Sequence, residues 1–184
     1  MSLVHFITHP DVLIDPAVPV PDWPLSPRGR ARMRAALAAP WVPGIRAIHC
    51  STERKAVDGA QILAGHLGLG FTAHPDLGEN DRSATGFLPR EEFEATADLF
   101  FAHPEASIRG WERAVDAQAR IVAAVDRLIA TPGDIAIVAH GGVGALLLCA
   151  LLGEGISRVR GQPPTAAGGF RFALDAATRR VRHG

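Results

Sequence analysis

The sequence predicts an α/β domain built as a three-layer α/β/α sandwich around a mostly parallel sheet. Short apolar runs, rich in β-branched residues and bounded by glycine or proline, alternate along the chain with segments of helical periodicity. Such alternation places helices on both faces of a parallel sheet. The chain has 184 residues, enough to bury one sizeable core, so we expect residues 1–184 to form a single domain.

The first part of the chain supplies a strand, a helix and a second strand. Leu3–Thr8 is an apolar, β-branched run with the pattern of a buried strand. Ser26 is a good N-cap and Pro27 suits the first helical position, so a helix is predicted over Gly29–Ala39. Ile45–Cys50 is again short and apolar, and it is predicted to be the next strand.

Helical patterns dominate the middle of the chain. Glu53–Leu67 carries small and apolar residues on one face and runs into Gly68, which is typical of a helix C-terminus. Gly110–Ala130 has the same periodicity and stops at a Thr-Pro-Gly turn. Residues 75–108 lie between these helices, have weak periodicity and several turn signals, and are predicted to form an insertion or lid.

The last part of the chain is predicted to contain two strands and one helix. Asp134–Ala139 has the pattern of a buried parallel strand. Val143–Leu152 is apolar almost all round, which indicates a helix inside the core. Gly169–Leu174 alternates between polar and apolar residues and is predicted to be an antiparallel edge strand.

Charge and composition narrow the classes of function. Nineteen basic residues balance nineteen acidic ones, so bulk charge gives no reason to expect a nucleic-acid or membrane partner. Cys50 and Cys149 lie in apolar runs, where buried reduced thiols are commoner than a disulfide. The longest apolar run, Ala145–Leu152, is too short to span a bilayer, and no secretory leader is evident. We therefore expect a cytoplasmic protein.

Three loops with charged or titratable side chains are predicted to meet at one edge of the sheet. His9 follows the first strand, Arg54 and Lys55 follow the second, and His140 follows the strand Asp134–Ala139. Loops after parallel strands emerge on the same side of a sheet, where ligands bind. The sequence therefore predicts one site that contains two histidines and a basic pair.

The chemistry of this edge suits an anion. Helix N-termini present free N–H groups and the positive end of the helix dipole, and Ser51 or Thr52 is expected to cap the second helix. Arg54 and Lys55 in its first turn are unfavourable for the helix itself unless a negative ligand offsets them. A glycine pair that begins at Gly141 would let a ligand approach closely.

The residues also resemble a known family, the histidine phosphatase superfamily, which has the phosphoglycerate mutase-like fold. Five short motifs of that family occur in order between residue 3 and about residue 150. No single motif is specific, but the order of the five is. They are Thr8-His9-Pro10 in place of Arg-His-Gly, Leu25-Ser26-Pro27-Arg28-Gly29, Ser51-Thr52-Glu53-Arg54-Lys55-Ala56, Leu77-Gly78-Glu79 and Val138-Ala139-His140-Gly141-Gly142.

The resemblance implies a phosphomonoester hydrolase that works through a phosphohistidine intermediate. His9 would attack phosphorus, and Glu79 would protonate the leaving oxygen from a carboxyl group whose pKa is raised. His140 would hold phosphoryl oxygens, and no metal or organic cofactor is implied. Asp81 is an alternative to Glu79 as the acid. The implied phosphate-binding residues are Thr8, Arg54, Lys55 and Gly141.

The sequence departs from the family pattern in its cations. Thr8 replaces the arginine that clamps phosphate with two donors, so one hydroxyl and no charge remain. Pro10 replaces glycine and removes a backbone N–H, and Lys55 supplies a point charge where an arginine fork is usual. Losing one such contact to an oxyanion costs on the order of 3 kcal/mol in the transition state. The candidates for a substitute guanidinium are Arg54, Arg82 and Arg28.

Other types of site are compatible with parts of the pattern. His9, His140 and Glu79 form a possible two-histidine, one-carboxylate metal site, although a neighbouring basic pair argues against a cation. Cys50 could act as a nucleophile, but a cysteine inside an apolar run more often packs. Gly142–Gly144 follows a strand as a dinucleotide loop would, but the third glycine of that motif is absent.

The function predicted is hydrolysis of a small phosphorylated metabolite or a phosphohistidine-type substrate. The main alternative is a catalytically silent phosphate-ligand binder or interaction protein on the same fold, and mutase activity is a third hypothesis. The predicted partner is thus a small phosphorylated molecule, with no nucleic acid and no membrane. Residues 10–24 and 75–108 are expected to select it.

Overall fold

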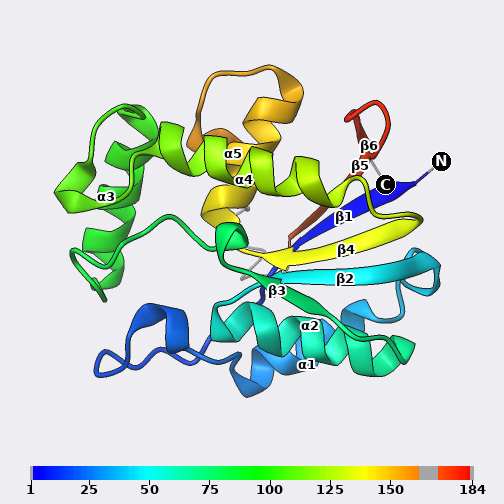
Figure 1. The fold of residues 1–184 in the computed structure, drawn as a ribbon. Coiled ribbons are helices and arrows are strands. Elements are labelled where there is room, and N and C mark those ends of the chain that lie inside the picture. Colours follow the sequence, from blue (N-terminus) through cyan, green and yellow to red (C-terminus); the bar gives the residue numbers. More distant parts are fainter. Residues whose placement is uncertain (1, 162–169, 183–184) are drawn as a thin grey trace.

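The computed structural model describes residues 2–161 and 170–182, and its centre is a six-stranded sheet (Figure 1). The strand order is β3-β2-β4-β1-β5-β6. The first four strands in this order are parallel, whereas β5 and β6 run antiparallel to their neighbours. The strands are β1 (Leu3–Thr8), β2 (Ile45–Ser51), β3 (Thr72–His74), β4 (Asp134–Ala139), β5 (Arg171–Asp175) and β6 (Val181–Arg182).

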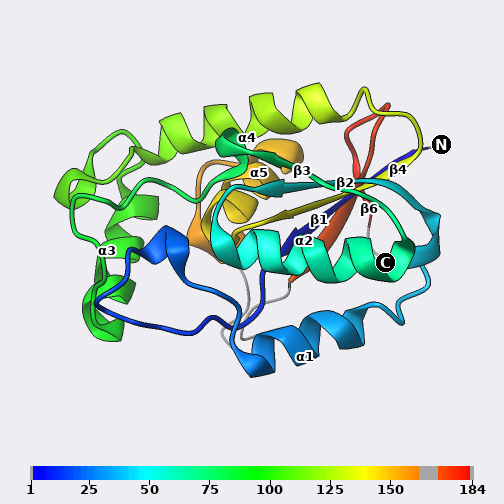
Figure 2. The same cartoon turned by 60° about the horizontal axis from the view of Figure 1, so that its bottom comes forward.

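Helices cover both faces of the sheet, which confirms the predicted three-layer α/β/α sandwich. In Figure 1, α1 (Pro27–Ala36) and α2 (Arg54–Leu67) lie below the sheet, and α4 (Ala114–Leu128) and α5 (Gly141–Leu152) lie above it. Figure 2 shows the same layers with the α1–α2 side brought forward. Each face has its own apolar core, because alternate residues of a strand point to opposite faces: Phe6 packs on the α4–α5 side and Ile7 on the α1–α2 side.

The helix boundaries follow from local signals that the sequence contains. The hydroxyl of Ser26 accepts a hydrogen bond from the N–H of Gly29 at 3.0 Å, which caps α1 as predicted. Gly68 ends α2 in the left-handed conformation, with φ at 65°. The N-cap of α2 is Glu53, not Ser51 or Thr52; the Ser51 hydroxyl instead accepts from the Glu53 N–H at 3.1 Å.

The segment 75–108 contains a helix that the sequence reasoning missed. Pro75–Leu77 forms the short helix η3, and Arg90–Ala102 forms α3, which extends beyond the end of the sheet (Figure 1). Apolar residues do recur through α3 at helical spacing, but turn residues on either side obscured the signal. The next helix, α4, begins at Ala114 instead of Gly110, because Ile108–Gly110 forms a separate turn of 3-10 helix with Arg109 in the left-handed region.

The strand predicted over 169–174 is β5, and it is antiparallel as expected. Gly169 lies outside the described residues. The edge of the sheet is not β5 itself, because the two-residue strand β6 pairs outside it. At the other edge β3 pairs with β2 and was likewise not predicted, since three residues are too few to give a periodic signal.

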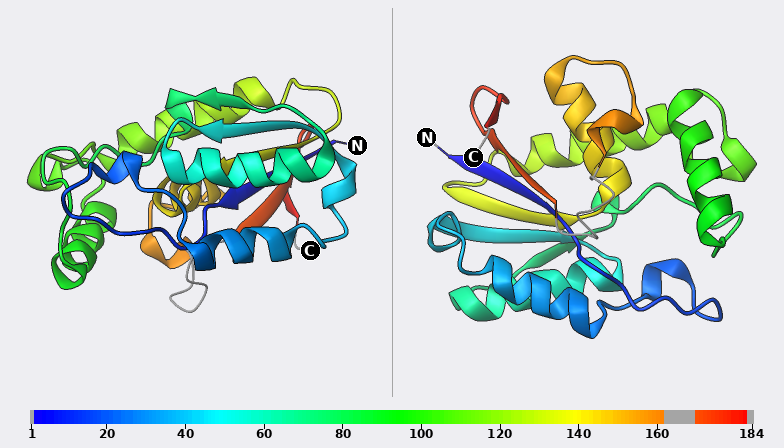
Figure 3. Two further views of the ribbon diagram at one scale, coloured as in Figure 1. Left: turned by 90° about the horizontal axis from the view of Figure 1, so that it is seen from below. Right: turned by 180° about the vertical axis from the view of Figure 1, so that it is seen from behind.

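The carboxyl ends of β1, β2 and β4 meet on the side of the sheet where α3 lies (Figures 1 and 3).

Both cysteines are free and buried, and burial raises the pKa of Cys50 to about 11, so this thiol is a core residue and not a nucleophile. Within residues 2–161 and 170–182, no helix combines the length and the apolar composition needed to cross a membrane.

Candidate active site

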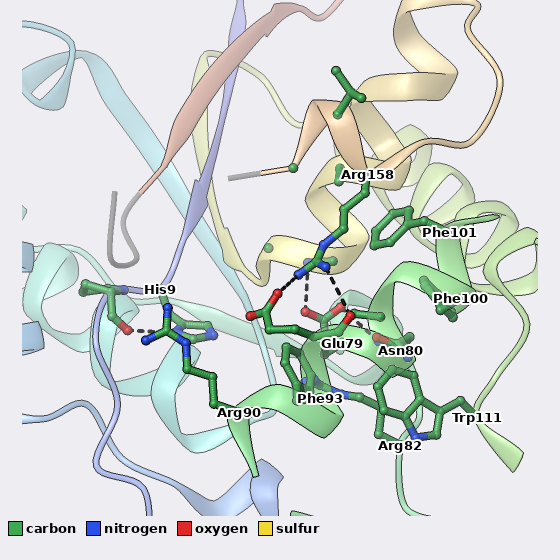
Figure 4. A pocket seen from close by; sticks show the side chains of 18 residues that line it. His9, Glu79, Asn80, Arg82, Arg90, Phe93, Phe100, Phe101, Trp111 and Arg158 are labelled. Atoms are coloured by element: carbon green, nitrogen blue, oxygen red, sulfur yellow. Dashed lines mark hydrogen bonds and ion pairs between the residues drawn. The ribbon is translucent and has the colours of Figure 1, made fainter. Parts of the chain in front are cut away.

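A cavity of about 1050 Å³ lies at the carboxyl edge of the sheet, between the strand ends and α3 (Figure 4). His9 borders it directly after β1, and Glu79 and Arg82 come from the loop before α3. Arg90 of α3 and Arg158 of the short helix η5 (Arg158–Arg160) add positive charge to the wall. The aromatic part of the wall consists of Phe93, Phe100, Phe101 and Trp111.

His9 is held as a neutral imidazole with a fixed tautomer. Its Nδ1 lies 2.9 Å from the carbonyl oxygen of Pro10, which can only accept, so Nδ1 carries the proton. Burial, together with the charges of His140 and Lys55, lowers the pKa of His9 to about 3, although the Pro10 carbonyl and Glu79 oppose this change. At neutral pH the ring is therefore uncharged and Nε2 has a free lone pair, as a nucleophile requires.

His140 is the second histidine of the site and is completely buried. It is the N-cap of α5, and its ring centroid lies 5.2 Å from that of His9 in an edge-to-face arrangement. Its Nε2 is 3.4 Å from Oε1 of Glu53, and neither ring nitrogen has a hydrogen-bond partner among the described residues. Burial lowers the pKa of His140, although the carboxylates of Glu53 and Glu79 oppose this. A buried imidazole without partners is ready to bind a ligand atom.

The carboxylate of Glu79 caps the N-terminus of α5. Oε2 accepts from the N–H of Gly142 at 2.9 Å, and Oε1 accepts from the N–H of Val143 at 2.9 Å and of Asn80 at 3.0 Å. A Cβ atom on Gly142 would lie only 2.6 Å from Oε1, so glycine is needed for this close approach. The side chain is thus fixed directly beside His140.

These contacts lower the pKa of Glu79, whereas a raised pKa is expected from the sequence. Burial raises this pKa, but the charges of Arg82 and His140 and the hydrogen bond from Gly142 lower it by more, so the net change is downward. The role inferred from the sequence implies a raised pKa for Glu79. The hydrogen bonds from the N–H groups of α5 depend on the tertiary structure and are not visible in the sequence. Asp81 does not line the cavity; its carboxylate is exposed and accepts from the N–H of Ser83 at 2.8 Å.

Lys55 is buried in an ion pair and does not line the cavity. Its Nζ lies 2.6 Å from Oε2 of Glu53 and donates to the carbonyl oxygen of Val20 at 2.8 Å. Oε1 of Glu53 accepts from the N–H of Glu79 at 2.8 Å and also faces His140. Burial raises the pKa of Glu53, but His140, Lys55 and these hydrogen bonds lower it by more, to about 2. Glu53 therefore neutralises Lys55, the cation of the third motif.

Two other predicted phosphate-binding residues point away from the cavity. Arg54 is exposed, and its Nε donates to Asp58 at 2.9 Å. Thr8 is 1% exposed and its hydroxyl donates to the carbonyl oxygen of Phe170 at 3.1 Å and accepts from the Phe170 N–H at 2.9 Å. The alternation of β1 places Thr8 on the same face as Phe6, against α5. Gly141 does line the cavity.

Glu53 is a site residue that the sequence reasoning did not single out, whereas Arg82 was named only as a possible cation. Arg82 was one of three candidates for a substitute guanidinium, and it alone of the three lines the cavity. Arg28 is 74% exposed near Asp11, 3.8 Å away. Glu53 carried a local signal, since an acid directly before a basic pair at a helix start suggests an ion pair.

The possible metal site would need a cluster of ligating side chains among the residues that the structure describes. No three His, Cys, Asp or Glu side chains come together there in a way that could hold a metal ion. The oxygens of Glu79 instead accept hydrogen bonds from the backbone N–H groups of α5.

Comparison with solved structures agrees with the fold. The chain has the fold of a mycobacterial glucosyl-3-phosphoglycerate phosphatase (TM-score 0.79, 22% identity, 99% of this chain and 96% of that chain covered). YhfR of Bacillus stearothermophilus is similar as well (TM-score 0.78, 22% identity, 99% and 95% covered). The mycobacterial phosphatase has also been solved with inorganic phosphate and with VO3. No curated protein matches the sequence.

A family model provides the assignment. The model described as histidine phosphatase superfamily (branch 1) matches residues 17–181, most of the chain. The match begins after His9, so the unusual Thr8-His9-Pro10 lies outside it. The fold, the order of the motifs and this match together show that the chain belongs to the histidine phosphatase superfamily.

Proposed function

We propose that the protein is a phosphatase that hydrolyses phosphomonoesters through a phosphohistidine formed on His9. The observation that carries the proposal is the state of His9: a neutral ring at the cavity wall, with Nδ1–H held by Pro10 and Nε2 unprotonated. Nucleophilic catalysis by histidine needs this tautomer and this charge. Membership of the superfamily and phosphatases among the structural neighbours support the same activity.

The reaction would take place in two transfers. Nε2 of His9 attacks phosphorus, the N–P bond forms, and the bond to the ester oxygen breaks as that oxygen takes up a proton. Water then gives a proton to the carboxylate of Glu79 and attacks phosphorus, the N–P bond breaks, and inorganic phosphate leaves while Nε2 regains its lone pair. His140, buried and without partners beside His9, would donate to a phosphoryl oxygen. This sequence of steps requires no metal and no organic cofactor.

Glu79 is the proposed proton donor to the leaving oxygen. It is ionised in the free protein, so it must take up a proton when the ester binds. A phosphoryl dianion close to a carboxylate raises the pKa of the carboxylate, which provides the physical reason for that uptake. Residues 75–108 supply Glu79, Arg82 and α3 to the wall, and we assign them the role of a substrate-selecting lid.

A second candidate function is a catalytically silent phosphate-ligand binder. The observation in its favour is that Glu79 is fixed as the cap of α5 and has a lowered pKa. In addition, neither Thr8 nor Lys55 presents a donor to the cavity. A site of this kind would bind a phosphorylated ligand and release it unchanged.

The test is chemical capture of the intermediate. Incubation of the full chain with a reactive aryl phosphate should leave an acid-labile, base-stable phosphate on the protein, and His9→Ala should lose both the label and the turnover. Turnover in His9→Ala within about tenfold of the parent would refute the nucleophile. Binding of phosphate or vanadate by the parent, without turnover of any ester in a broad panel, would establish the silent binder. Turnover that a chelator abolishes would contradict the metal-free reaction.

A further inference from the structure

We propose that Arg82 is the guanidinium that binds the phosphoryl group, in place of the arginine that Thr8 replaces in the first motif. The inference rests on the proposed function, because it names the cation for the same phosphate. Arg82 lies 74 positions after Thr8, in the loop that leads to α3, and its proposed role is called the phosphate clamp below.

The need for such a residue follows from the fate of the cations near His9. Lys55 is 2% exposed and its ammonium is paired with Glu53. Arg54 is paired with Asp58 at the outer surface. His140 is neutral as long as its pKa stays lowered. A phosphate ester carries close to two negative charges, and among the described residues that follow the strands neither Lys55 nor Arg54 is placed to balance them.

Arg82 has the geometry of a preorganised ligand. It lines the cavity, and its guanidinium carbon lies 5.1 Å from the ring centroid of Phe93 and 5.6 Å from that of Trp111 (Figure 4). Contact with two aromatic rings restrains the guanidinium, which lowers the entropy lost when a ligand binds. Within the described residues Arg82 has contacts with aromatic rings but no ion pair and no side-chain hydrogen bond, so its donors are available.

Arg82 is also close to the catalytic end of the cavity. Its charge is the first of those that lower the pKa of Glu79, and it acts on His140 as well. Glu79 binds the N–H groups of Gly142 and Val143, directly after His140. Arg82 therefore belongs to the same cluster as the two proposed catalytic groups, and its fork matches the planar pair of oxygens that a phosphoryl group offers.

The other two arginines of the wall are weaker candidates. Arg158 is already engaged by the carboxylates of Glu94 and Asp98 and by the carbonyl oxygen of Glu94. Arg90 is exposed at the first position of α3, and among the described residues it has no cation–π contact of the kind that Arg82 makes. Arg90 is the rival that the experiment must separate from Arg82.

The experiment is calorimetric titration of the full chain with inorganic phosphate and, separately, with orthovanadate. Arg82→Gln should weaken both affinities by about 10- to 100-fold, the range expected for losing a hydrogen-bonded charge. Arg82→Lys, which keeps the charge but not the fork, should fall between the parent and Arg82→Gln. Arg28→Gln removes a distant surface arginine and should stay within about twofold of the parent. Thermal unfolding confirms that each variant is folded.

Each result decides between the claims. Unchanged affinity in Arg82→Gln, in a parent that binds phosphate and labels His9, would overturn the clamp and leave the phosphatase standing. A larger loss in Arg90→Gln than in Arg82→Gln would also overturn it. Loss of affinity in Arg82→Gln, in a protein that turns over no ester, would support the clamp on a silent binder. A parent that binds neither phosphate nor vanadate at millimolar concentration would refute both proposals.

Discussion

The buried carboxylate of Glu53 gives a quantitative test of how the site is held together. Glu53 joins three parts of the site: it pairs with Lys55, accepts from the backbone of Glu79 and faces His140. Glu53→Gln keeps the size of the side chain and removes its charge. It leaves the Lys55 ammonium, 2% exposed, with the carbonyl oxygen of Val20 as its remaining neighbour in the described contacts.

The expected loss of stability follows from the pKa of Glu53. This pKa falls from 4.5 in the unfolded chain to about 2 in the folded protein. Because the folded protein binds the proton less tightly, the ionised carboxylate contributes stability that is fully present above pH 4.5 and is lost as the pH falls towards 2. At about 1.4 kcal/mol for each pH unit between the two values, the contribution at pH 7 is about 3–4 kcal/mol.

The assay is urea unfolding of the parent and of Glu53→Gln at several pH values from 7 to 3. We expect the variant to be less stable by about 3–4 kcal/mol at pH 7, and the difference should narrow progressively below pH 4.5. Glu154→Gln is the matched control, since it breaks an exposed pair with Arg160 and should change stability far less. A difference in the free energy of unfolding that stays constant between pH 7 and pH 3, or that is no larger than the control's, would show that the charge of Glu53 does not stabilise the fold.

Two further substitutions test the other departures from expectation. Thr8→Val removes the hydroxyl that both donates to and accepts from Phe170. The free energy of unfolding should therefore fall by about 1–3 kcal/mol while phosphate affinity is unchanged. Weaker phosphate binding in a fully stable variant would mean that Thr8 faces the ligand. Glu79→Gln cannot donate a proton, so turnover of alkyl phosphates should fall by about 10²- to 10⁴-fold. Turnover of nitrophenyl phosphate, whose leaving group needs little protonation, should fall much less. Equal losses for both esters would show that Glu79 is not the acid.

Much of the fold is determined locally and was therefore readable from the sequence. The strands Leu3–Thr8 and Asp134–Ala139 have the predicted bounds because each is a short apolar run that ends at a polar or turn residue. Ser26 and Gly68 mark helix ends by hydrogen-bonding and backbone preferences that depend on a few neighbouring residues. The strands β3 and β6 were missed because they are too short for any periodicity.

The sequence also determined where the chemistry gathers. His9, Glu79 and His140 follow from motif order and from the rule that loops after parallel strands share an edge, and the structure places all three at one end of the sheet. That rule concerns backbone direction. It says which residues come near one another, and it does not say which atoms of their side chains meet.

The partners of the charged side chains were decided only by the tertiary structure. Lys55 and Arg54 are adjacent in the sequence, yet one is buried against Glu53 and the other is exposed beside Asp58. Glu79 lies far in sequence from the helix that it caps, and that contact turned a carboxyl expected to have a raised pKa into one whose pKa is lowered. Electrostatic energies depend on distance and burial in three dimensions, and neither quantity is encoded in any short stretch of sequence.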